Sequence, residues 1–125
     1  MQSFLSTETN GEIVTVHFKH ARIVEETVIQ QISAELLALI DKTTETNVLL
    51  NFDHVEFLSS SALGALIKLN KKCKEYKINL KLCNIQSDIM QVFKITRLDK
   101  VLAIYRDAEV AYGAFKKTGG LFFRK

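Results

Sequence analysis

Hydrophobic side chains recur with a two-residue period in several short stretches of the chain. The clearest stretch is EIVTVHF, where Val14, Val16 and Phe18 fall on one face, as in a half-buried strand. The dipeptide Asn10-Gly11 comes just before it and favours a tight turn, so the preceding SFLSTET can pair with it as a hairpin. Alternating or continuously apolar stretches of this kind predict strands at residues 3–9, 12–18, 46–52, 77–85 and 101–105.

Between these strands the hydrophobic period lengthens to three or four residues, which is typical of amphipathic helices. Helices are predicted at residues 25–42, 60–76, 87–95 and 107–117. Strands that alternate with helices indicate an α/β fold. We expect a single-domain sandwich over residues 1–117, with a mixed central β-sheet of about five strands and about four helices. Residues 118–125 are expected to form a flexible tail.

The helix predicted at residues 60–76 carries an informative pattern. Leu63 and Ile67 lie roughly 100–140° from the centre of its main apolar stripe. They either pack under a neighbouring helix or loop, or form a small apolar contact surface for a partner protein. The stripe itself, which is expected to face the sheet, consists of Ala62, Leu66, Leu69, Cys73 and Tyr76.

Three serines precede this helix in the stretch FLSSSALGAL. Serines at this place usually cap the helix. On the helical wheel Ser60 points within about 60° of Leu63 and Ile67, whereas Ser61 points away from both. A phosphate on Ser60 would lie at a helix N-terminus, where N–H groups stabilise anions, and would repel a partner docked on the apolar pair. A cap and a phosphorylation switch therefore both remain open.

Composition narrows the class of protein. The 125 residues are 47% hydrophobic and 25% charged with a net charge of +3, which is typical of one globular domain. Cys73 and Cys83 lack the spacing of a metal or redox motif and are expected to be buried, reduced thiols. The N-terminus does not read as a secretory signal, and no apolar run approaches the roughly 18 residues of a membrane span. We therefore expect a cytoplasmic protein with no membrane association, metal or cofactor.

The sequence also argues against other classes of function. A serine hydrolase needs a base near its nucleophile and a strained turn that presents the serine. FLSSSALG does not match the Gly-x-Ser-x-Gly motif of such a turn. The sequence also has no glycine-rich phosphate loop, which argues against nucleotide binding. Lysines without interleaved aromatic residues favour a solvated helix face over a nucleic-acid site. We expect no catalytic residues and no nucleic-acid partner. The residues weighed for these roles are His17, His20, His54, Lys68, Lys71, Lys72, Lys74 and Lys77.

The stretch NVLLNFDHVEFLSSSALGALIKLNKKCKEYKINLKLCNI resembles the core of a STAS domain of the bacterial anti-sigma factor antagonist type. The resemblance covers about residues 10–115 and includes the later segment VFKITRLDKVL. It implies a non-enzymatic regulator. In this family an ATP-dependent anti-sigma factor kinase phosphorylates a serine at the start of the helix. The unphosphorylated form binds that kinase, and a phosphatase restores the binding form.

Carried over by position, the family's phosphorylated serine falls on Ser60. The family's preceding aspartate falls on Ser59, which can still cap the helix, and its glycine falls on Ala62. The segment HARIVEE has Val24 where the family often has another aspartate. Two positions of kinase contact are thus altered. The resemblance and the wheel together predict partner contacts by Ser59, Ser60, Leu63 and Ile67.

Two functions follow from the resemblance. The leading one is an anti-sigma factor antagonist that binds an anti-sigma factor with serine kinase activity, is switched at Ser60, and is reset by a serine phosphatase. The alternative is a STAS scaffold or interaction module in a bacterial signalling complex, without phosphorylation. A homodimer through the apolar tail residues Leu121, Phe122 and Phe123 is a further expectation.

Overall fold

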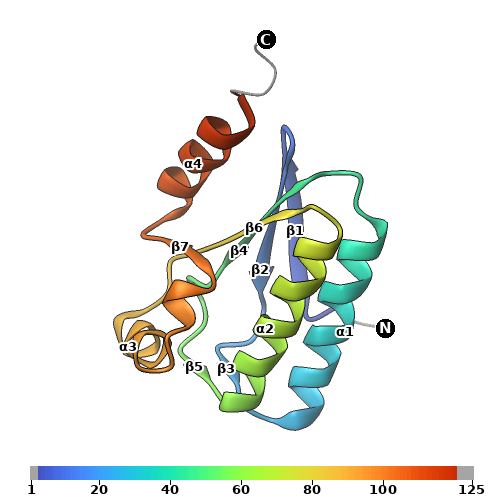
Figure 1. Cartoon of the computed structure of the whole chain (residues 1–125). Coiled ribbons are helices and arrows are strands. Elements are labelled where there is room, and N and C mark those ends of the chain that lie inside the picture. Colours follow the sequence, from blue (N-terminus) through green and yellow to red (C-terminus); the bar gives the residue numbers. More distant parts are fainter. Residues whose placement is uncertain (1–2, 121–125) are drawn as a thin grey trace.

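The computed structural model describes residues 3–120 of the chain. Seven strands, four α-helices and one 3₁₀ helix follow one another along this part of the chain (Figure 1). In chain order they are β1 (Leu5–Asn10), β2 (Ile13–Phe18), β3 (Arg22–Ile23), α1 (Glu26–Lys42), β4 (Asn47–Asn51), β5 (Phe57–Leu58), α2 (Ser60–Glu75), β6 (Asn79–Cys83), α3 (Ser87–Ile95), η1 (Leu98–Lys100), β7 (Ala103–Tyr105) and α4 (Ala108–Gly120).

Five strands form a mixed central sheet in the order β1-β2-β4-β6-β7. The strands β1 and β2 are antiparallel and meet at Gly11, whose φ of 62° suits the tight turn predicted there. The pairs β2–β4, β4–β6 and β6–β7 are parallel. The predicted α/β sandwich with a mixed five-stranded sheet and four helices is therefore confirmed.

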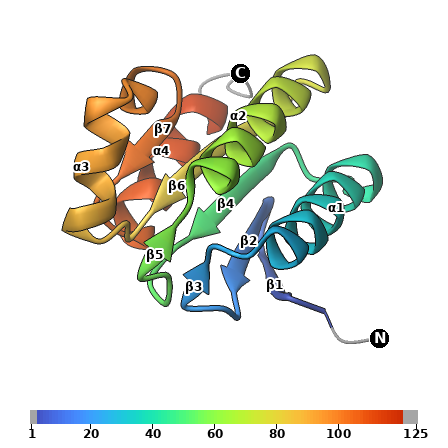
Figure 2. The same ribbon diagram turned by 90° about the horizontal axis from the view of Figure 1, so that it is seen from below.

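The helices cover the two faces of the sheet unequally (Figure 2). Apolar residues of α1, α2 and α3 share one large core cluster with Val14, Val16 and Phe18 of β2. A smaller cluster on the other face joins Ile13 of β2 to residues of α4. Every residue of β4 is buried, because this central strand lies between the two layers.

Three features differ from the sequence prediction. The strands β3 and β5 form a separate two-stranded parallel ribbon. Each strand has only two residues, which is too short for a hydrophobic pattern to predict it. The strand predicted at 101–105 is shorter, because the N–H groups of Val101 and Leu102 bond back to the carbonyl of Leu98 in η1 at 3.0 and 2.8 Å. The last helix runs to Gly120 rather than to residue 117. Residues 121–125, including the three apolar tail residues proposed for a dimer, lie outside the described part of the chain.

The predicted buried stripe of α2 is confirmed at Ala62, Leu66, Leu69 and Cys73, and the buried face is wider than predicted because it also includes Leu63. Asn70 is buried, whereas Tyr76 is 50% exposed, so the prediction that Tyr76 faces the sheet is wrong. Tyr76 is the C-terminal cap residue of α2, and its hydroxyl donates a hydrogen bond to Asp41 of α1 at 3.0 Å. Lys72 lies 2.9 Å from the same carboxylate. These contacts place the Tyr76 edge of α2 beside α1, at the surface.

Candidate functional site

The start of α2 is held by the β3–β5 ribbon at one end of the molecule (Figure 1). The backbone N–H groups of Glu56 and Phe57 both donate to the carbonyl of Ala21, at 2.7 and 3.2 Å. The N–H of Ser59 donates to the carbonyl of Ile23 at 3.1 Å. The segment that leads into α2 is therefore fixed by backbone bonds before the serines begin.

Ser59 caps α2, as predicted. Its backbone is extended, and its hydroxyl oxygen accepts a hydrogen bond from the N–H of Ala62 at 3.2 Å. This bond satisfies one of the N–H groups that a helix start leaves without an intrahelical partner. The hydroxyl of Ser59 is thus committed to the backbone of the helix.

Ser60 is the first residue of α2, and its side chain is exposed. By helical spacing it shares a side of α2 with Gly64, Ile67 and Lys71. Ser61 is exposed as well, but it falls toward Lys72, the side of α2 that contacts α1. Within the described residues the hydroxyls of Ser60 and Ser61 make no hydrogen bond, and both serines are exposed. Only Ser60 lies on the Ile67 side of the helix.

Leu63 and Ile67 behave differently from each other. Ile67 is 44% exposed, as a contact residue requires. Leu63 is 7% exposed and belongs to the same core cluster as Phe93 of α3 and Leu98 of η1. Of the two alternatives left open for Leu63, the structure therefore supports packing into the core and not an exposed contact surface. Leu63 is buried together with Ala62, Leu66, Leu69 and Cys73, because the large core cluster covers a wider face of α2 than the predicted stripe.

The structure adds apolar surface that the sequence prediction missed. Phe57 of β5 is 50% exposed, and the guanidinium of Arg22 lies 4.4 Å from the centre of its ring. Val24 is 38% exposed and follows Ile23, whose carbonyl bonds to Ser59. An aromatic residue two positions before Ser59 was the only sequence signal for this surface. Phe57, Val24 and Ile67 thus provide exposed apolar side chains close to the start of α2.

Both cysteines lie away from this surface and are buried. Burial raises the pKa of the Cys73 thiol to about 11. The pKa of Cys83 is raised to about 12, first by burial and then by the nearby carboxylates of Asp53 and Asp107. Both groups are therefore protonated at neutral pH, and the prediction that the two cysteines are buried is confirmed.

None of the three serines hydrogen-bonds to a histidine anywhere in residues 3–120. His17 instead lies 3.7 Å from the carboxylate of Glu8 and 3.7 Å from that of Asp53. The described residues include no cluster of His, Cys, Asp and Glu side chains fit for a metal ion. None of the described helices is long and apolar enough to cross a membrane.

Comparison with known proteins identifies the family. A family model described as the STAS domain matches residues 5–111. The chain belongs to the STAS domain family. The resemblance noted in FLSSSALG and its flanking strands is thereby confirmed.

Several STAS proteins are similar to this chain. BtrV of Bordetella bronchiseptica, which is named as a candidate anti-sigma factor antagonist, is 28% identical over 94 residues, covering 75% of this chain and 80% of BtrV. A STAS domain protein of Planctomyces limnophilus has the same fold with a TM-score of 0.79 and 24% identity, over 91% of this chain and 98% of that one. SpoIIAA of Bacillus, solved in its phosphorylated form, has a TM-score of 0.66 and 18% identity, over 88% and 98%.

Proposed function

We propose that this STAS domain acts as an anti-sigma factor antagonist that binds an anti-sigma factor with serine kinase activity and is switched by phosphorylation of Ser60. One observation carries the proposal. Ser59 makes the cap bond to Ala62, which leaves the adjacent Ser60 exposed at the helix start with its hydroxyl unbonded. A kinase can reach this hydroxyl without breaking the cap.

The helix start suits a phosphate. The first turn of α2 contains no acidic residue, so a phosphoryl group on Ser60 meets no carboxylate there. The free N–H groups and the helix dipole stabilise its negative charge. The modification therefore adds about two negative charges at a place where the fold tolerates them.

The surroundings of Ser60 suit a binding surface. Three exposed apolar residues, Val24, Phe57 and Ile67, belong to the β3–β5 ribbon region and to α2. Ser59 and Ser60 lie between Phe57 and Ile67 in the sequence. Leu63 would act on binding only through packing, because it is buried. A phosphate on Ser60 would place charge beside this apolar surface and repel the partner. The name of BtrV and the phosphorylated form of SpoIIAA are in line with this function.

The remaining features of the proposal follow from the switch. A serine phosphatase would restore the binding form, and the use of ATP by the kinase places the protein in the cytoplasm. The protein itself would be a regulator and not an enzyme. It would need no cofactor and no nucleic acid.

One observation favours the alternative, a STAS interaction module without phosphorylation. Ser59 takes the place of the aspartate that the family keeps before its target serine. Because residue 59 is a serine, no carboxylate directly precedes Ser60, and the Ser59 hydroxyl already accepts the Ala62 N–H. A kinase that requires that acid would not modify this chain, and the same surface would then bind its partner constitutively.

Charge variants distinguish the two functions. Binding of a purified, histidine-kinase-like anti-sigma factor from the same organism would be measured by calorimetry for the wild type, Ser60→Asp and Ser61→Asp. We expect Ser60→Asp to lose binding and Ser61→Asp, which carries the same charge one residue along, to keep it. Equal binding by all three would instead support the constitutive module.

A further inference from the structure

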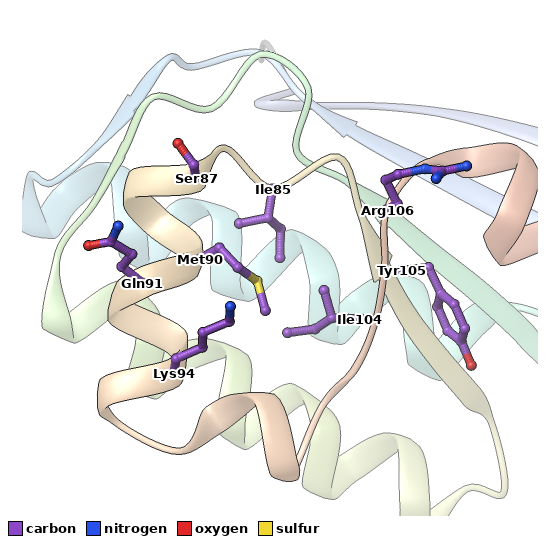
Figure 3. A pocket seen from close by; sticks show the side chains of 8 residues that line it. All are labelled: Ile85, Ser87, Met90, Gln91, Lys94, Ile104, Tyr105 and Arg106. Atoms are coloured by element: carbon purple, nitrogen blue, oxygen red, sulfur yellow. The ribbon is translucent and has the colours of Figure 1, made fainter.

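A hollow of about 490 Å³ lies between α3 and β7, on a part of the molecule that the proposed switch does not use (Figure 3). Its volume falls within the usual range for small-molecule sites, about 300–1,000 Å³. One wall is α3, and the other is β7, the last strand of the sheet. The residues that line it are Ile85, Ser87, Met90, Gln91, Lys94, Ile104, Tyr105 and Arg106.

The centre of the hollow is apolar. Ile85, Met90 and Ile104 point toward one another from three different segments, and each is only half-buried (Figure 3). They pack against the large core cluster from its edge, so their inner sides are fixed and their outer sides line the hollow. A short apolar group bound there would be removed from water on several sides at once.

One cation faces this apolar centre. The side chain of Lys94 bends back along α3, so that its ammonium group lies toward the side chain of Met90 (Figure 3). No carboxylate in residues 3–120 pairs with it, and the lining contains no acidic residue. The guanidinium of Arg106 points away from the hollow and bonds to Asp107 at 3.2 Å.

We propose that this hollow binds a small amphipathic carboxylate, with its apolar body over Ile85, Met90 and Ile104 and its carboxylate on the ammonium of Lys94. A single inward-facing ammonium matches a monovalent head group better than a phosphate dianion, which several donors usually hold. Uncharged or cationic ligands of the same size would leave Lys94 without a counter-charge. The site is separate from Ser60 and does not depend on the proposed function.

The probe for this site is sodium octanoate, followed by amide chemical shifts of the full-length, ¹⁵N-labelled protein. We expect saturable shifts confined to residues 85–94 and 104–106. Octan-1-ol, which has the same chain without the charge, should bind about tenfold more weakly, because it loses the charge-assisted hydrogen bond. Shifts that never saturate, that spread over the whole surface, or that are as strong with octan-1-ol would overturn the proposal.

Two variants locate the binding. Lys94→Gln should raise the dissociation constant for octanoate about tenfold, whereas Lys74→Gln, another exposed lysine outside the hollow, should leave it unchanged. Met90→Trp should fill the hollow and abolish binding of both probes. Because Lys94 is exposed, its variant is expected to fold even if Met90→Trp does not. Unchanged affinity in Lys94→Gln would refute the role of the ammonium group.

Discussion

Two neighbouring hydroxyls at the start of α2 have different surroundings. The Ser59 oxygen accepts the Ala62 N–H at 3.2 Å and is half-buried, whereas Ser60 is exposed. A residue with extended backbone can turn its side chain back onto the helix, but the first residue with helical backbone points outward. This difference separates a structural serine from a candidate phosphorylation site.

Replacing Ser59 by alanine should weaken the helix start. We expect Ser59→Ala to lower the free energy of unfolding by about 1 kcal/mol, since the N–H of Ala62 loses its partner. Urea denaturation monitored by circular dichroism would measure the loss. Ser61→Ala is the control and should change stability by less than about 0.5 kcal/mol. An equal effect of the two substitutions would contradict the assignment of the cap.

Leu63 and Ile67 should separate stability from binding. Leu63→Ala should lower the free energy of unfolding by about 2–5 kcal/mol, because it leaves a cavity in the large core cluster. Ile67→Ala should change the free energy of unfolding by less than about 0.5 kcal/mol. It should, however, weaken the binding of the anti-sigma factor. Denaturant unfolding and calorimetric binding measure the two effects. A stable Leu63→Ala variant would contradict the observed burial.

At the scale of elements, α1 and α2 are joined near the C-terminal end of each by one carboxylate. Asp41 of α1 receives the hydroxyl of Tyr76 at 3.0 Å and lies 2.9 Å from the ammonium of Lys72. The hydrogen bond from Lys72, followed by that from Tyr76, lowers the pKa of Asp41. The charged form of Asp41 is therefore the one that these two contacts between the helices favour.

The lowered pKa of Asp41 gives this contact a pH dependence. At neutral pH both Asp41→Asn and Lys72→Gln should be less stable than the wild type, and Lys74→Gln, whose lysine has no such partner, should not. The wild-type advantage should persist down to the ordinary aspartate pKa of about 3.9 and disappear as the pH falls further and Asp41 becomes protonated. Urea unfolding across this pH range would test it. An advantage that grows on acidification would contradict the assigned charge state.

Elements with a repeated pattern could be predicted from the sequence, and elements without one could not. The alternation of Val14, Val16 and Phe18 fixed the face of β2 that enters the core. The β3–β5 ribbon has two residues on each side, so no period exists to detect. The orientation of α2 depends on its neighbours, which is why the burial of Leu63 and the exposure of Tyr76 could not be worked out from spacing alone.

At the scale of the whole molecule, the sheet order brings the site together. After β4 the chain passes through β5 of the β3–β5 ribbon and enters α2, so the serines lie at one end of the sheet. The helix α4 covers the face of the sheet opposite to α1 and α2 (Figure 2). The α/β class and the position of the serines were evident from the sequence. The contribution of Phe57 was not, because it depends on a ribbon formed with residues more than thirty positions away.

The central claim, that Ser60 is the switch, is tested most directly by mapping phosphate on the protein. The wild type, Ser60→Ala and Ser61→Ala would each be incubated with Mg-ATP and the histidine-kinase-like anti-sigma factor of the same organism, and then analysed by mass spectrometry. We predict one phosphate on Ser60 in the wild type and in Ser61→Ala, and none in Ser60→Ala. An unmodified wild type, or a phosphate that persists in Ser60→Ala, would contradict the claim.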